Sequence, residues 1–303
     1  MNTNGWDLCN LPNGDGMKSK SGPSSFFIAF LAMCSIAQAQ AQTTLTTITV
    51  TAPKPNEVQG NNASTFAFFS AFEYSGGSKG GDETDSEKPD DTPGQRTPAD
   101  ELSEYNDFNA LPDALKNIIT SSGILSAQLL QFFQNNGRIQ VVEGLGVYQA
   151  QYTPGVLKLD AETLRSFGDG NADYHARVFV SSIAHEVGHA MDKTSFTGST
   201  AAEYENYRAV REANAILNSM LVTSELENTL EIDVIMTGYG TDAQLTALFN
   251  NFAQNRQIDP LIDSLKNLVK SNTLNTQGLS DLNGDGSVDQ YDRYRQDYNN
   301  GYR

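Results

Sequence analysis

Cysteine and histidine are scarce in this chain, and their scarcity limits how it can bind a metal. The 303 residues include two cysteines, Cys9 and Cys34, and three histidines. Both cysteines fall within the first 40 residues, and their spacing gives neither a disulfide framework nor a thiolate metal site. A zinc site in the rest of the chain must therefore be built from His, Asp and Glu side chains.

Positively charged residues are also few. The chain has 20 Lys and Arg residues against 37 Asp and Glu, which gives a formal net charge of −17. Nucleic-acid binding is driven largely by cations that neutralise phosphates. We therefore expect no nucleic-acid partner and no attraction to anionic membranes. The acidic balance says little about the substrate.

The apolar runs are too short to span a membrane as a helix. The run from Phe26 to Ile36 has eleven residues, whereas a spanning helix needs about 20. It follows a basic start at Lys18 and precedes an Ala-x-Ala sequence in 37–41, as in a secretory signal peptide. We interpret 1–41 as this signal, with Met17 as the favoured initiator. The protein is then exported, to the periplasm or outside a bacterial cell, with no stable membrane insertion after signal removal.

The rest of the chain divides by composition. Residues 42–104 are rich in Thr, Ser, Gly, Asp and Pro, and we predict a disordered linker there. Periodic apolar residues over 105–275 indicate one folded domain. Its fold class is α+β, mostly helical with a small sheet. We expect helices in 112–119, 126–133 and most of 173–270, and strands in 138–142, 146–152 and 156–159.

The chemistry is concentrated in one helical segment with the pattern His-Glu-x-x-His. His185 and His189 are four residues apart, so a helix places both imidazoles on one face, where they can bind one zinc ion. Glu186 lies on the adjacent side and suits a general base. Zinc lowers the pKa of a bound water toward about 7, and the carboxylate takes its proton. Gly188 costs about 1 kcal/mol relative to Ala in a helix, so something must approach the backbone there.

Residues 184–192, Ala-His-Glu-Val-Gly-His-Ala-Met-Asp, resemble the active-site helix of the zincin superfamily of metallopeptidases. The resemblance implies a zincin-like domain that hydrolyses peptide bonds. The metzincin subgroup is excluded, because it requires Gly and His where this chain has Asp192 and Ser195. Zincins without a third histidine resemble the gluzincins, in which a Glu on the following helix completes the zinc site.

Two glutamates on the next helix are candidates for this third ligand. A capping box, Thr200 with Glu203, is expected to start that helix. Glu205 and Glu212 are seven residues apart and share a face, so either can reach the zinc. We favour Glu212, because its context in 211–218 is similar to the Glu-Ala-Asn helix of bacterial zincin-like toxin and effector domains. Asp192 and Asp242 are weaker candidates.

In zincins an edge strand beside the active helix holds the substrate backbone by strand addition. Residues 146–152 or 156–159 are candidates for this strand. Tyr239 is a candidate to stabilise an oxyanion, and its position in a predicted loop is the one feature that suggests this role.

The C-terminal segment 276–303 contains an acidic loop that matches the EF-hand pattern, with Gly286 at the sharp turn. Its final ligand is Asp292 in place of the usual Glu, which resembles the calcium loops of dockerins. Dockerins have two such loops and this chain has one. We predict a structural Ca²⁺ site whose side-chain ligands are Asp281, Asn283, Asp285, Ser287, Asp289 and Asp292.

The leading hypothesis is a secreted zinc endopeptidase that acts on a peptide or protein substrate. A toxin or effector is one role that such an endopeptidase can have. A toxin of this kind would have an immunity or inhibitor protein as its partner. The alternatives are a non-catalytic calcium-binding protein with a zincin-like fold and a zinc amidase acting on cell-wall material.

Overall fold

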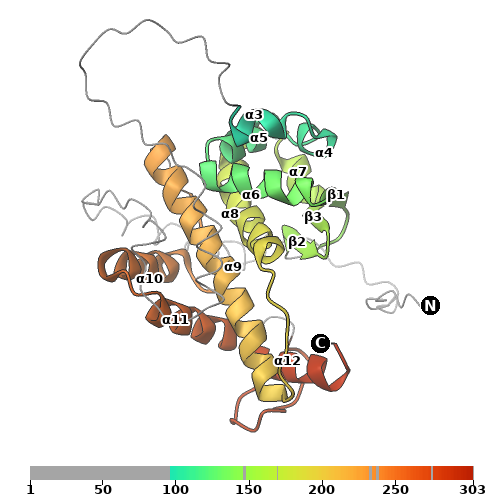
Figure 1. Ribbon diagram of the computed structural model, residues 1–303, viewed down its shortest axis with the longest axis vertical. Helices are drawn as coiled ribbons and strands as arrows, with labels where there is room; N and C mark the ends of the chain where they lie inside the picture. Colours follow the sequence, from blue (N-terminus) through green and yellow to red (C-terminus); the bar gives the residue numbers. More distant parts are fainter. Residues whose placement is uncertain are drawn as a thin grey trace, which may run out of the picture. The chain divides into compact units, whose positions relative to one another are not determined.

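The computed structural model describes residues 96–302, apart from 146–147, 169, 232–233, 237–238 and 274–275. The predicted signal peptide and most of the predicted linker lie outside the described residues. Within the described part, the chain is mostly helical with one small sheet (Figure 1), which confirms the α+β prediction. The elements are α3 (Pro98–Leu102), α4 (Asn106–Asn109), α5 (Asp113–Thr120), α6 (Gly123–Gln134), β1 (Arg138–Val142), β2 (Ala150–Thr153), β3 (Val156–Asp160), α7 (Ala161–Ser166), α8 (Ala172–Met191), α9 (Ala201–Leu230), α10 (Asp242–Asn255), α11 (Ile258–Lys270) and α12 (Gln290–Asn299).

Helix α3, the first that the structure describes, lies inside the segment predicted to be a disordered linker, 42–104. Thr97 starts α3 with a capping box to Asp100, and Leu102 is fully buried in a hydrophobic core. The linker prediction is therefore wrong for its last residues. Their polar composition conceals a helix start signal and one core residue, and a single buried leucine is too weak a pattern to read from composition.

The sheet has the strand order β1-β3-β2. Strand β1 pairs in parallel with β3, and β2 pairs antiparallel with β3. Because β3 is central, the prediction of 156–159 as the substrate-binding edge is wrong. Strand β2 is an edge strand of the sheet in the part of the chain that the structure describes, and it lies beside α8.

The long helix α9 contributes to two hydrophobic cores. Its C-terminal residues Val222 and Leu226 pack with α3–α6, the sheet and α8. Its earlier residues, such as Ile216 and Met220, pack with α10, α11 and Tyr294 of α12. The C-terminal helix α12 is thus packed directly against α9.

A buried polar network fixes α8 against α9. The Asn218 amide nitrogen donates to the Ala184 carbonyl at 2.7 Å and to Gln128 Oε1 at 3.1 Å. In return, the Gln128 amide donates to Asn218 Oδ1 at 2.7 Å. Because unpaired buried polar groups are costly, these bonds hold the three helices α6, α8 and α9 in one register.

The two long helices approach each other closely at Gly188. A Cβ atom at this position would lie 2.9 Å from Ala215 Cα and 3.0 Å from Asn218 Cβ. The sequence-based expectation that something approaches the backbone at Gly188 is confirmed, and the approaching element is α9. Two small residues, Gly188 and Ala215, therefore permit the close contact.

The substitution Gly188→Ala should lower the free energy of unfolding by about 1 to 3 kcal/mol, as in other over-packed cores. Denaturation with urea measures this change. Gly168→Ala is the control, since its Cβ would meet the Arg165 carbonyl oxygen at an ordinary 3.4 Å. Alanine is the better helix former, so an increased stability of Gly188→Ala would contradict the close α8–α9 contact.

Candidate metal centre

Helix α8 presents His185 and His189 on one face, with their ring centroids 4.9 Å apart. Both side chains are largely buried, with exposed fractions of 11% and 13%. The helix is anchored in the first core by the buried residues Phe179, Val180, Ile183, Ala184, Val187 and Ala190. This packing fixes the direction in which the two imidazoles point.

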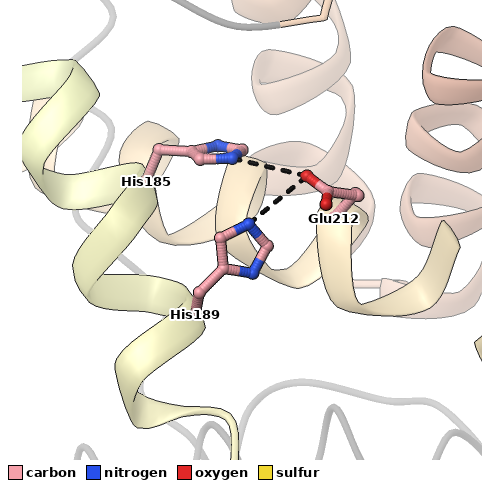
Figure 2. Close-up of side chains that lie close together, drawn as sticks. All are labelled: His185, His189 and Glu212. Atoms are coloured by element: carbon pink, nitrogen blue, oxygen red, sulfur yellow. Dashed lines mark ion pairs between the residues drawn. The ribbon is translucent and has the colours of Figure 1, made fainter. Parts of the chain in front are cut away.

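Glu212 reaches both histidines from α9 (Figure 2). Its Oε2 atom lies 3.5 Å from His185 Nε2 and 3.3 Å from His189 Nε2. Among the residues that the structure describes, these three form the one group of His, Cys, Asp or Glu whose ligand atoms all lie within 4.8 Å. The three residues predicted to bind zinc are thus brought together, although their metal role stays a prediction.

The spacing of these atoms suits zinc. Two ligands bound about 2.0 to 2.1 Å from a tetrahedral zinc lie about 3.3 to 3.4 Å from each other. The two N–O separations of 3.5 and 3.3 Å are close to this value. Two His and one carboxylate are also a known donor set of catalytic zinc. One feature departs from the usual pattern: His185 Nδ1 is buried without a hydrogen-bond partner, whereas ligating histidines normally donate from this nitrogen.

The electrostatics of the cluster favour a charged carboxylate. Burial works against the charge of Glu212, but the two imidazoles, His189 first, hold its pKa well below its usual range. Burial also opposes protonation of His189, but the Glu212 carboxylate outweighs it and the pKa of His189 is raised. The site therefore stabilises an anionic carboxylate between two imidazoles, which is a charge arrangement that suits a divalent cation.

The alternative third ligand, Glu205, lies elsewhere. It is buried and forms an ion pair with Arg295 of α12. The capping box expected at the start of α9 is confirmed, with Thr200 and Glu203 as its members. Glu205 and Glu212 do share a face of α9, but two helical turns separate them, and only Glu212 is level with the histidines.

The two aspartates considered as weaker ligands have structural contacts instead. Asp192 ends α8, accepts hydrogen bonds from the backbone and side chain of Thr194, and pairs with Arg211 at 3.4 Å. Asp242 opens α10 and accepts a hydrogen bond from the Met236 amide at 2.9 Å.

The predicted general base is held by the edge strand. Glu186 Oε2 accepts a hydrogen bond from the Tyr152 backbone N–H at 2.7 Å. Because antiparallel ladder bonds alternate and Gln149 bonds to β3, Ala150 and Tyr152 direct their backbone groups away from β3, and the Tyr152 amide meets Glu186 of α8. Sequence reasoning missed this contact, since a backbone amide leaves no signal in the sequence.

Tyr239 lies next to the cluster, with its ring centroid 6.4 Å from that of His185. Burial, and then the negative charge of Glu212, raises the pKa of Tyr239 far above its ordinary value. Its hydroxyl therefore stays protonated and can act as a hydrogen-bond donor in the site.

The acidic loop leads into α12. Asp281 accepts backbone hydrogen bonds from Gly284 at 2.6 Å and Gly286 at 2.9 Å, and Gly286 has the positive φ expected at the sharp turn. Asp285 forms an ion pair with Lys270 at 2.7 Å, and this ammonium group holds the pKa of Asp285 well below its usual range.

The remaining predicted calcium ligands also bond within the loop. Asp292 is fully buried and accepts from the Asn283 amide at 2.9 Å and the Asp289 amide at 3.0 Å. The Ser287 hydroxyl donates to Asp285 at 2.7 Å. The six predicted ligands thus lie in the loop and in the first turn of α12, linked by hydrogen bonds, and their calcium role stays a prediction.

Glu212→Ala should lower the zinc affinity of the purified protein by more than about 100-fold, since losing an outer partner of a ligand alone costs about 10- to 100-fold. Glu205→Ala is the matched control on the same helix. It should cost stability, because it leaves Arg295 unpaired, and change zinc affinity little. Competition with a chromogenic chelator measures both. The opposite ranking would transfer the ligand role to Glu205.

Comparison with known proteins adds no relative. No protein-family model, curated protein or solved structure matches the chain. No helix in the part described by the structure is long and apolar enough to cross a bilayer. The residues of α8 and α9 themselves are therefore what points to a metal centre here.

Proposed function

We propose that this protein is a secreted zinc-dependent endopeptidase with a zincin-like domain. His185, His189 and Glu212 bind zinc in this proposal, and Glu186 is the general base. The observation that carries it is the largely buried cluster in which the Nε2 atoms of His185 and His189 lie 3.5 and 3.3 Å from Oε2 of Glu212. A helix pair held in register by a buried polar network supports this arrangement.

Zinc bound to these residues would polarise the scissile carbonyl and lower the pKa of a water molecule toward about 7. Glu186 lies on the same helix as the two histidines and accepts a hydrogen bond from the amide of Tyr152. This bond orients the carboxylate to take a proton from the attacking water. The same carboxylate can then return the proton to the leaving amine.

The surroundings of Glu186 suit a peptide substrate. Strand β2 is an edge strand of the sheet and bonds directly to Glu186, and in this proposal an extended peptide pairs along this edge by strand addition. The neutral hydroxyl of Tyr239 is available to donate to a developing oxyanion. These two features favour a peptide backbone as the substrate over a small molecule.

The leader in 1–41 supports export to the periplasm or beyond the cell. A secreted endopeptidase of this kind can act as a toxin or effector, and its producer would then need an immunity or inhibitor protein. Its negative charge argues against a nucleic-acid partner.

A second, structural cation site is proposed in the EF-hand-like loop. The observation that favours it is the Asp281 carboxylate, which accepts hydrogen bonds from the backbone amides of Gly284 and Gly286 and so shapes the loop. Calcium bound by Asp281, Asn283, Asp285, Ser287, Asp289 and Asp292 would compete with Lys270 for Asp285.

Glu186→Gln should retain zinc and lower the rate of casein or peptide cleavage by about 10²- to 10⁴-fold, the usual contribution of a general base. The control is Glu162→Gln, at an exposed position on α7. Metal content and cleavage are measured on the same preparations. Equal cleavage by wild type and Glu186→Gln would end the peptidase proposal.

The same measurements separate the alternatives. A zinc-binding protein that cleaves cell-wall amides and leaves casein intact is the amidase. A protein that binds calcium and no zinc is the non-catalytic calcium-binding protein.

Lys270→Met should raise calcium affinity by about twofold to fivefold, because it frees Asp285 from an ion pair near the surface. Lys266→Met is the matched control one turn earlier on α11, where the ammonium pairs with Asp263. Calorimetric titration with Ca²⁺ measures both. Equal affinities in the two variants would show that Asp285 is not a calcium ligand.

A further inference from the structure

The face of α9 that carries Glu212 is covered by the C-terminal helix α12. Glu205, Arg208 and Glu212 are spaced i, i+3 and i+7, so they share one face of α9. Arg295 of α12 pairs with Glu205, and Asp297 lies 3.7 Å from Arg208. Helix α12 therefore contacts the two positions that directly precede the metal ligand on this face.

The direction of α12 brings its earlier residues toward Glu212. The Tyr298 hydroxyl donates to the Ser199 carbonyl, before the start of α9, and Arg295 pairs with Glu205. The Tyr294 ring lies further along, 4.9 Å from the Arg208 guanidinium carbon. Arg208 is one helical turn from Glu212 on α9, so the Tyr294 ring lies near the part of α9 that carries the ligand.

The hydroxyl of Tyr294 has no hydrogen-bond partner in this position. The side chain is 1% exposed, and the oxygen is fully buried. Gln290, one turn earlier on α12, interacts with the hydroxyl, but the contact lacks hydrogen-bond geometry. The hydroxyl is therefore a buried donor without a hydrogen-bond partner, on a ring that contacts Arg208 one helical turn from Glu212.

We propose that Tyr294 is a positioning residue of the metal centre, whose hydroxyl donates a hydrogen bond to the Glu212 carboxylate when this carboxylate binds the metal. Ligating carboxylates are usually hydrogen-bonded by outer partners, and these partners matter for metal affinity. The proposal rests on the metal site formed by His185, His189 and Glu212, and it does not require peptidase activity.

The C-terminal segment thus belongs to the metal centre and is more than an appended calcium loop. Asp289 and Asp292 form the capping box that starts α12, directly before Tyr294. The acidic loop therefore fixes the start of the helix that carries the donor.

The test compares Tyr294→Phe with Tyr298→Phe, which removes a hydroxyl one turn later that bonds to Ser199. Chelator competition should show zinc affinity lowered about 10- to 100-fold in Tyr294→Phe and nearly unchanged in Tyr298→Phe. The metal-free Tyr294→Phe protein should melt no lower than wild type, because the lost hydroxyl has no partner there. A loss of metal-free stability without a selective loss of zinc affinity would assign Tyr294 a packing role and overturn the proposal.

A double-mutant cycle isolates the contact with Glu212. In the Glu212→Ala background, Tyr294→Phe should cause no further loss of zinc affinity. An equal loss in both backgrounds would overturn the proposal, as would equal affinities of Tyr294→Phe and Tyr298→Phe. A wild-type protein that binds no zinc removes the metal centre and this inference together. Zinc binding without peptide cleavage would overturn the peptidase proposal alone. The comparison of Tyr294→Phe with Tyr298→Phe would then still test the positioning role of Tyr294.

Discussion

The close contact of α8 with α9 at Gly188 and Ala215 is the constraint on which the candidate site depends. A Cβ atom on residue 188 would lie 2.9 Å from Ala215 Cα, so only glycine permits this distance between the helices. One turn along α9, the same distance allows the short reach of Glu212 to both histidines. The network of Asn218, Gln128 and Ala184 then prevents the helices from sliding.

Much of this arrangement is predictable from local sequence patterns. The i, i+4 spacing of His185 and His189 defines one face of a helix, and the helix start at Thr200 follows from its capping box. The strand prediction is correct for β1, where three of the five residues, Ile139, Val141 and Val142, are β-branched. Such signals depend on a few neighbouring residues, and for this reason they can be read without knowledge of the fold.

The remaining features depend on tertiary packing, which leaves little trace in one sequence. Glu205 and Glu212 share one face of α9, and tertiary packing separates their roles: Glu205 pairs with Arg295 of α12, whereas Glu212 is level with the two histidines. The bond from the Tyr152 amide to Glu186 involves a backbone group that every residue but proline possesses. The order of the strands likewise decides which strand lies at an edge of the sheet. The sequence pattern of 156–159 fits a central strand as well as an edge strand.

X-ray absorption spectroscopy of the zinc-loaded protein tests the central claim most directly. Zinc bound by His185, His189 and Glu212 should have four light ligands, two of them imidazole nitrogens about 2.0 to 2.1 Å from the metal and at least one a carboxylate oxygen. The imidazole signal should fall by half in a His189→Ala variant. Sulfur ligands at about 2.3 Å, or a shell of oxygens without imidazole, would contradict a metal centre built from α8 and α9.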